Sequence, residues 1–164
     1  MTRRPQAPAL ASQAPSESSA PHLLGPEAQG LTPAGARTAR LRVRYAETDR
    51  MGVVYYANYL VWFEVGRTEW LRQTGWSYQE MESDGISLPV IEAHCEYRQP
   101  ARYDDDIEVA TRGTLVTPIR VRFDYEVARG ADGTITAIGH TVHAAVDTSG
   151  KPCRLPARVL DILA

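Results

Sequence analysis

The alternation of apolar and charged side chains over residues 119–127 constrains the fold more than any other feature of the sequence. A side-chain period of two, sustained over these nine residues, is typical of a β-strand with one buried face. Thr117-Pro118 before the segment and the run GADG at 130–133 after it predict hairpin turns. We therefore expect an antiparallel sheet whose apolar face must be covered by another element. The apolar positions of the alternation are Ile119, Val121, Phe123, Tyr125 and Val127.

Other segments also have the pattern of β-strands. In residues 41–47, Leu41, Val43 and Tyr45 alternate with arginines, which indicates a first, half-buried strand. Because the strands after residue 88 are joined mostly by short turns, we expect them to be antiparallel neighbours of one another. The remaining strand segments lie at about 88–98, 105–116 and 134–147.

Residues 58–75, NYLVWFEVGRTEWLRQTG, predict one long helix. Asn58 is a suitable N-cap, no proline interrupts the segment, and Gly75 can supply a left-handed C-terminal stop. Few polar positions interrupt the apolar ones, so the helix should be largely surrounded. Only this segment is apolar enough to cover the sheet. We therefore predict an α+β fold in which a curled, antiparallel, five-stranded sheet wraps around one long central helix.

The chain divides into two parts of different composition. Residues 1–38 are rich in proline, alanine and serine and show no apolar period, so we expect a disordered tail. The two arginines near the start would suit a transit peptide, but Glu17, Glu27 and the prolines favour a plain tail. Residues 39–164 should form the single folded domain.

Composition excludes several classes of function. A net charge of -2 does not favour binding to nucleic acid, and no stretch approaches the ~20 apolar residues of a transmembrane helix. Cys95 and Cys153 occur without a secretory signal, so we expect reduced thiols in a cytoplasmic protein. The histidines and cysteines lack the spacing of a metal site, and neither a metal nor another cofactor is expected.

The stretch between the first strand and the helix places a carboxylate close to a helix start. Asp49 lies in a turn with Gly52, seven residues before Tyr56, where the helical segment begins. An Asp in a turn is usually an Asx-turn or capping residue. A helix N-terminus, however, has unpaired N–H groups and a positive dipole end, which stabilise an oxygen that gains negative charge. A carboxylate and an oxyanion donor could thus come from one stretch of chain.

The motif RYAETDRMGVVYYANYLVWFEVGR resembles the hotdog-fold acyl-CoA thioesterases of the 4-hydroxybenzoyl-CoA thioesterase type, including short-chain relatives associated with the Tol-Pal envelope system. The resemblance covers roughly residues 41–156. It implies the hotdog fold and hydrolysis of an acyl-CoA thioester to a free acid and coenzyme A. It also implies that Asp49 is the catalytic carboxylate and that the backbone N–H of Tyr56 polarises the thioester carbonyl.

The resemblance suggests further site residues and an assembly. Gly52 would let the loop turn beside the substrate, and the acyl group would lie along the helix near Val54, Tyr59 and Trp62. Many family members have His where this chain has Tyr56, whereas the 4-hydroxybenzoyl type has Tyr. The small core and the exposed sheet face predict a homo-oligomer, either a dimer or a tetramer of two dimers.

Other interpretations of the same residues stay open. A non-catalytic acyl-CoA-binding or scaffold protein would keep the fold without needing Asp49. A hotdog dehydratase or hydratase would need a catalytic His in the strand and loop before the helix, with a paired acidic residue on the helix, and residues 41–57 contain no His. Glu64 and Arg67 have the spacing of an ion pair on the helix, which is a structural role rather than a catalytic one.

Overall fold

The computed structural model describes residues 35–163. Most of the predicted tail lies outside these residues. The first strand nevertheless includes Arg37 and Thr38, so the folded part begins slightly earlier than predicted. The elements are β1 (Arg37–Arg42), a 3-10 turn η1 (Tyr45–Glu47), α1 (Asn58–Gln73), α2 (Tyr78–Ser83), β2 (Val90–Tyr97), β3 (Asp106–Thr117), β4 (Arg120–Arg129), β5 (Ile135–Ala144) and α3 (Ala157–Leu163).

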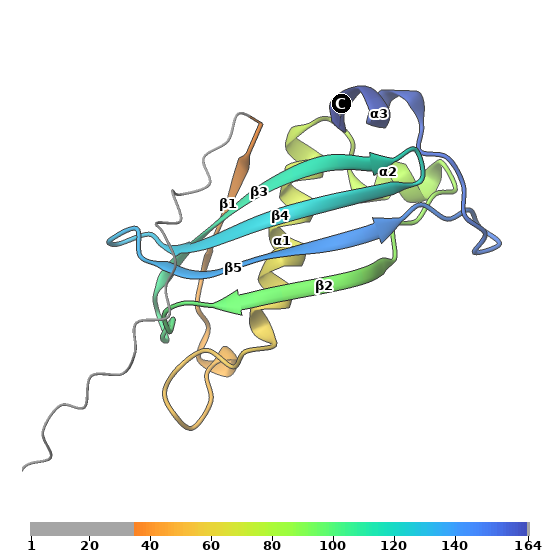
Figure 1. Ribbon diagram of the computed structural model, residues 1–164. Helices are drawn as coiled ribbons and strands as arrows, with labels where there is room; N and C mark the ends of the chain where they lie inside the picture. The colour runs from red at the N-terminus through yellow and green to blue at the C-terminus, as the bar shows by residue number, and fades with distance from the viewer. Residues whose placement is uncertain (1–34, 164) are drawn as a thin grey trace, which may run out of the picture.

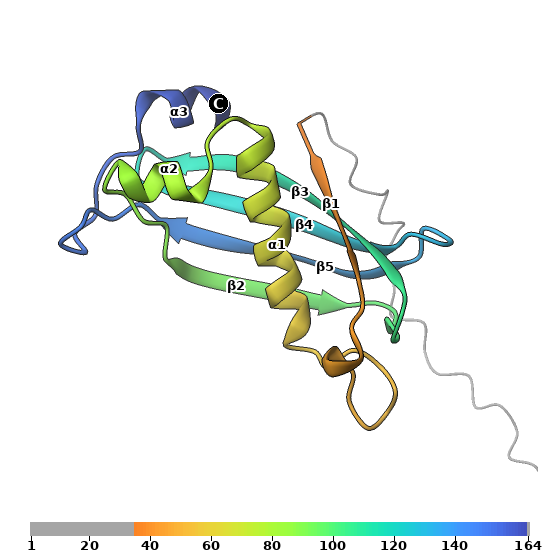
Figure 2. The ribbon, with the colours of Figure 1, turned by 180° about the vertical axis from the view of Figure 1, so that it is seen from behind.

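The five strands form one antiparallel sheet in the order β1-β3-β4-β5-β2. The sheet curls around α1, which crosses one face of it (Figures 1 and 2). Both predicted hairpins are present, since β3 pairs with β4 and β4 pairs with β5. The predicted α+β hotdog architecture is confirmed.

The position of β2 differs from the prediction. β2 pairs with β5, with Cys95 opposite Gly139, and lies at the edge of the sheet, far from β3. The connection 98–105 is therefore a crossover and not a hairpin. Backbone hydrogen bonds hold this connection to other parts of the chain: the Arg98 N–H donates to Thr136 O at 2.9 Å, and Ala101 O accepts the Val54 N–H at 2.8 Å. These groups are used by other parts of the chain and cannot close a tight turn.

The first strand ends earlier than predicted. β1 stops at Arg42, and Tyr45 begins η1 and is exposed instead of half-buried. The turn forms because the Glu47 carboxylate accepts the Arg44 N–H at 2.7 Å, which replaces a strand bond. Val43 is buried and Leu41 is half-buried, so these two inward positions agree with the alternation.

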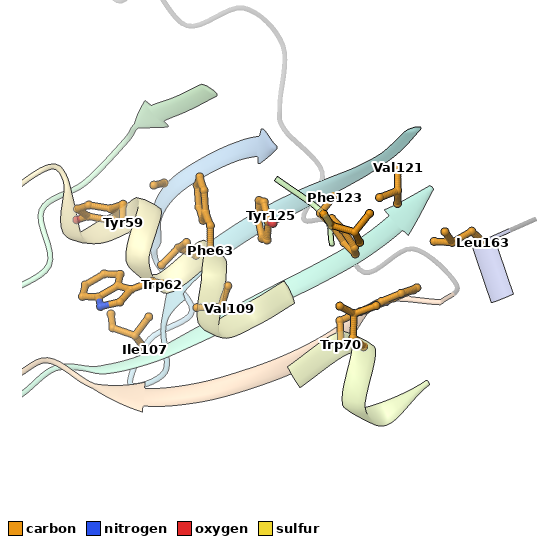
Figure 3. Close-up of a cluster of buried hydrophobic side chains, with 14 of the residues drawn as sticks. Tyr59, Trp62, Phe63, Trp70, Ile107, Val109, Val121, Phe123, Tyr125 and Leu163 are labelled. Atoms are coloured by element: carbon orange, nitrogen blue, oxygen red, sulfur yellow. The ribbon is translucent and has the colours of Figure 1, made fainter. Parts of the chain in front are cut away.

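The core lies between α1 and the concave face of the sheet (Figure 3). Phe63 stacks on Tyr125 with ring centroids 4.3 Å apart, and Trp70 meets the ring of Phe123 edge-on at 5.6 Å. These contacts fix where α1 lies along β4. The helix therefore presents its N-terminal end to one edge of the sheet, beside the end of β2 (Figure 2).

The C-terminal end of α1 agrees with the prediction, whereas its N-terminal cap differs from it. Gly75 has a φ of +84°, as expected for a left-handed C-terminal stop. Asn58 is not the N-cap. It is the first helical residue, Ala57 occupies the cap position, and the Asn58 side-chain amide donates instead to Glu47 O at 2.8 Å. The side chain thus ties the helix to the preceding loop.

Candidate active site

The loop that carries Asp49 is a small hairpin. Thr48 and Val54 form an isolated antiparallel bridge, and the Asp49 N–H donates to Val53 O at 2.9 Å. Gly52 reverses the chain with a φ of +73°, a conformation that a residue with a side chain rarely adopts. The Val54 N–H then donates to Ala101 O at 2.8 Å, which fastens the hairpin to the crossover connection.

The Asp49 side chain is half-buried and uses one oxygen for the turn. Its Oδ1 accepts the Met51 N–H at 2.8 Å, which is an Asx-turn. Its Oδ2 has no hydrogen-bond partner within residues 35–163. Asp49 is therefore both a turn residue and a carboxylate with one oxygen available for chemistry.

The start of α1 provides the second predicted group. The Tyr55 N–H donates to Glu47 O at 2.8 Å, and the Asn58 N–H donates to Tyr55 O at 2.9 Å. The Tyr56 N–H between them has no acceptor among the described residues. It lies at the positive end of a 16-residue helix, where a donor is best placed to stabilise a developing negative charge.

Glu47 is a site residue that the sequence did not reveal. The residue is only 5% exposed, and its carboxylate accepts bonds from Arg44 and from Trp62 Nε1 at 3.2 Å. Burial would raise the pKa of this carboxyl, but the bonds from Arg44 and Trp62 lower the pKa below its ordinary value. Glu47 therefore stays ionised and anchors the loop. Nothing in the sequence distinguishes it from an exposed Glu, since its burial depends on where Trp62 lies.

A cavity of about 330 Å³ lies beside this loop. Asp49 and Tyr56 both border it, together with two of the predicted acyl-contacting residues, Val54 and Tyr59. A larger hollow of about 540 Å³ lies near the start of β3, but it contains no predicted site residue. The residues that line the cavity beside Asp49 are Asp49, Met51, Val53, Val54, Tyr56, Tyr59, Tyr97, Arg98, Gln99 and Pro100.

Two of the predicted substrate contacts lie elsewhere. Trp62 is 1% exposed and packs behind Tyr59, with ring centroids 4.8 Å apart, so it supports the cavity wall without lining it. Gly52 shapes the loop but does not border the cavity. The apolar pattern of the helix could not show that Tyr59 lines the cavity while Trp62 supports its wall, because both residues are buried.

The predicted ion pair on α1 does not form. Arg67 is 7% exposed, and its Nε donates to the Tyr78 hydroxyl at 2.8 Å, whereas Glu64 is exposed. The two side chains leave the helix toward different surroundings. Burial lowers the pKa of Arg67, but the nearby hydroxyls of Tyr78 and Tyr125 leave it above its ordinary value.

Tyr97 is a second site residue that the sequence did not reveal. It borders the cavity from the end of β2. Its ring meets that of Tyr59 edge-on, with centroids 5.2 Å apart. The sequence placed Tyr97 on a strand, but its closeness to α1 follows from the pairing of β2 with β5, which was predicted wrongly.

Two further features bear on the class of site. Within residues 35–163, no group of three or more His, Cys, Asp or Glu side chains is arranged to hold a metal ion. In the same part of the chain, every helix is too short or too polar to span a bilayer.

Known proteins resemble this chain in sequence and in structure. The sequence profile of the thioesterase-like superfamily matches residues 43–163. The Bacillus subtilis protein YneP is 38% identical over 113 residues, which cover 68% of this chain and 81% of YneP. The acyl-CoA thioester hydrolase YbgC of Escherichia coli O6:H1 is 32% identical over 121 residues, which cover 73% of this chain and 90% of YbgC.

A solved structure agrees with these relatives. The 1,4-dihydroxy-2-naphthoyl-CoA thioesterase from Synechocystis superposes with a TM-score of 0.73 at 27% identity, over 79% of this chain and 96% of that protein. The resemblance read from the Asp49 motif is thus confirmed at the level of the family. The chain belongs to the thioesterase-like superfamily.

Proposed function

We propose that the protein hydrolyses an acyl-CoA thioester to a free acid and coenzyme A. One observation carries this proposal: Asp49, with an unused Oδ2, and Tyr56, with an unused N–H, border the same cavity at the positive end of α1. The names of two relatives, an acyl-CoA thioester hydrolase and a dihydroxynaphthoyl-CoA thioesterase, support a CoA thioester as the substrate class.

The proposed chemistry divides between these two groups. The thioester carbonyl carbon is attacked, and the negative charge that forms on its oxygen is stabilised by the Tyr56 N–H and the dipole of α1. Asp49 Oδ2 either removes a proton from the attacking water or attacks the carbonyl itself to give a mixed anhydride. In the general-base route the C–S bond breaks and the proton that Asp49 took from water passes to the sulfur, which gives the free acid and the thiol. In the anhydride route the C–S bond breaks with release of the coenzyme A thiolate, which takes a proton from water, and a water molecule then hydrolyses the anhydride to release the acid and restore Asp49. Label in Asp49 after a single turnover in ¹⁸O-water would identify the anhydride route, since the carboxylate gains a solvent oxygen only when water attacks the Asp49 carbon of an anhydride.

The cavity wall supports an apolar acyl group. Met51, Val53 and Pro100 contribute aliphatic surface, while Tyr59 and Tyr97 contribute aromatic rings. Sites of this composition bind ligands by burying apolar surface and use few polar groups for orientation. Hydrolysis rates across acetyl, medium-chain, long-chain and aromatic acyl-CoAs would identify the preferred acyl group.

Replacement of Asp49 by Asn tests the catalytic role. Asn keeps an oxygen that can accept the Met51 N–H, so the Asx-turn should survive while the negative charge is lost. We expect Asp49→Asn to lower kcat by about 10²-fold or more with a modest change in KM, as for a group that acts in the transition state. Steady-state kinetics on the best acyl-CoA of the panel measures both constants.

A matched variant and a contrary result complete this test. Tyr56→Phe keeps the backbone N–H and should change kcat little. If Asp49→Asn retains near-normal turnover, Asp49 is a turn residue only. If the wild-type protein binds acyl-CoA but hydrolyses none of the panel, the non-catalytic binding function takes the place of this proposal.

We also propose that the protein works as a homo-oligomer. Supporting this, α1 exposes Leu60, Val61 and Val65, and the edge strand β2 exposes Val90 and Ile91. Clustered apolar residues and an unpaired strand edge favour contact with another copy of the chain. The cytoplasmic location expected from the unpaired cysteines stays a prediction.

A further inference from the structure

Tyr97 connects the edge strand to the start of α1. Its hydroxyl donates to the backbone carbonyl of Tyr56 at 3.1 Å, although the two residues are 41 positions apart in the chain. Its ring packs edge-on against Tyr59, which is itself buried beneath the cavity. Tyr97 therefore makes two different contacts at the proposed site, one through its hydroxyl and one through its ring.

The Tyr97 hydroxyl bonds the Tyr56 carbonyl, and the neighbouring peptide group carries the Tyr56 N–H, the proposed oxyanion donor. The peptide that carries the Tyr56 N–H is held on one side by Glu47 O, which accepts the Tyr55 N–H. The carbonyl of that same peptide accepts the Asn58 N–H at 2.9 Å. On the other side, the Tyr56 carbonyl accepts the long Tyr59 N–H bond at 3.4 Å and the Tyr97 hydroxyl.

These restraints differ in where they come from. Glu47, Asn58 and Tyr59 belong to the same short stretch of chain as Tyr56, so they move with the loop and the helix start. Among the described residues, Tyr97 is the one hydrogen-bond partner that holds Tyr56 from the sheet. A donor that stabilises a transition state must be held in place before the reaction.

We infer that Tyr97 is a positioning residue for hydrolysis: its hydroxyl holds the backbone of Tyr56 in the orientation that presents the Tyr56 N–H to the thioester oxygen, and its ring forms part of the acyl wall. This inference rests on the proposed function. The hydroxyl keeps its proton for this role, because burial, with Cys95 nearby, raises the pKa of Tyr97 to about 12.

The two contacts can be separated by substitution. Tyr97→Phe keeps the ring and removes the hydroxyl, so we expect kcat to fall about fivefold, the effect of one net hydrogen bond, with KM nearly unchanged. Tyr97→Leu also removes the ring and should raise KM for the preferred acyl-CoA. Tyr103→Phe is the matched control, because Tyr103 pairs with Tyr45 and does not border the cavity, and its kcat should equal that of the wild type.

A measurement without substrate tests the contact itself. The Tyr56 carbonyl and the Ala57 N–H belong to one peptide, so loss of the Tyr97 bond should shift the amide ¹⁵N resonance of Ala57. We expect this shift in Tyr97→Phe and none in Tyr103→Phe. A shift together with the fall in kcat supports the inference.

The contrary results are distinct from those that test the proposed function. If Asp49→Asn is inactive but Tyr97→Phe keeps wild-type kcat, the proposed function stands and the positioning role is wrong. If Tyr97→Phe raises KM and leaves kcat and the Ala57 resonance unchanged, the residue only lines the cavity. If the wild-type protein hydrolyses no acyl-CoA, the proposed function fails and the positioning role fails with it.

Discussion

Glu47 and Asp49 show how two carboxylates in one motif acquire different roles. Glu47 is buried, and its oxygens accept bonds from Arg44 and Trp62. Asp49 is half-buried, its Oδ1 accepts the Asx-turn bond, and its Oδ2 has no hydrogen-bond partner in the described part of the chain. A buried, fully bonded carboxylate contributes to structure, whereas a carboxylate with a free oxygen beside a cavity can react. The environment of each side chain, and not its type, therefore separates the anchor Glu47 from Asp49, the carboxylate that we propose to be catalytic.

His143 is a buried titratable residue away from the site. Its Nδ1 lies 2.9 Å from Leu88 O and its Nε2 lies 2.8 Å from the Thr141 hydroxyl, which in turn bonds the Tyr125 hydroxyl at 2.8 Å. A neutral ring protonated on Nδ1 satisfies every member of this chain. Burial, aided by the charge of Arg67, lowers the pKa of His143 from 6.5 to about 4, although the bond to Leu88 opposes this.

This pKa predicts how stability changes with pH. Because the pKa is lower in the folded state, the unfolded state takes up a proton first as pH falls. The contribution of neutral His143 to the free energy of unfolding is complete above about pH 6.5. It is lost progressively as the pH falls toward 4. We expect the unfolding free energy to fall by about 2 kcal/mol between pH 7.5 and pH 5 from this group alone.

Denaturant titrations at fixed protein concentration measure this change. His143→Gln removes the titrating ring, so the variant should be less stable at pH 7.5 but should depend less on pH over the same range. Equal pH dependence in the variant and the wild type would mean that His143 binds its proton equally well in the folded and unfolded states.

At the scale of elements, the sequence predicted individual segments better than their arrangement. The alternation in β4 and the apolar run of α1 depend on local burial, and both elements were found within one or two residues of their predicted bounds. The place of β2 depends on which strand its edge meets, and a strand pattern contains no such information. Tyr97 was missed for that reason. That Asp49 and Tyr56 border one cavity could be predicted, because the loop and the helix start are adjacent in the chain.

The contact between α1 and β3 leads to a prediction about Gly66. A Cβ at this position would lie 2.5 Å from Thr111 Oγ1 and 2.7 Å from Val109 Cγ1, both on the strand beneath. Ala would gain about 1 kcal/mol of helix propensity, whereas overpacking a core typically costs about 1–3 kcal/mol. Because Thr111 and Val109 are buried and β-branched, their χ1 angles are restricted, so overpacking should prevail and Gly66→Ala should destabilise the protein by up to about 2 kcal/mol.

Urea denaturation measures the effect of Gly66→Ala. Gln73→Ala, at the exposed end of the same helix, is the control and should change stability by no more than about 0.5 kcal/mol. A stabilised Gly66→Ala variant would show that α1 can move away from β3 at little cost.

At the scale of the whole molecule, the sheet curls around one helix and leaves apolar surface uncovered. The side of α1 that faces away from the sheet has nothing packed over it within residues 35–163 (Figure 2). The edge strand β2 pairs only with β5 in the same part of the chain and is exposed along most of its length. Soluble proteins rarely leave such a helix face and strand edge together in water.

The assembly in solution should therefore exceed one chain. Light scattering coupled to gel filtration should return at least twice the chain mass of 18.1 kDa. Val61→Glu combined with Ile91→Lys places charge on the exposed face of α1 and on the β2 edge, so this variant should shift the protein to a smaller species. Val116→Lys charges an equally exposed apolar residue on β3 and should leave the mass unchanged. A wild-type mass of one chain would exclude the homo-oligomer, and an equal shift in both variants would place the interface elsewhere.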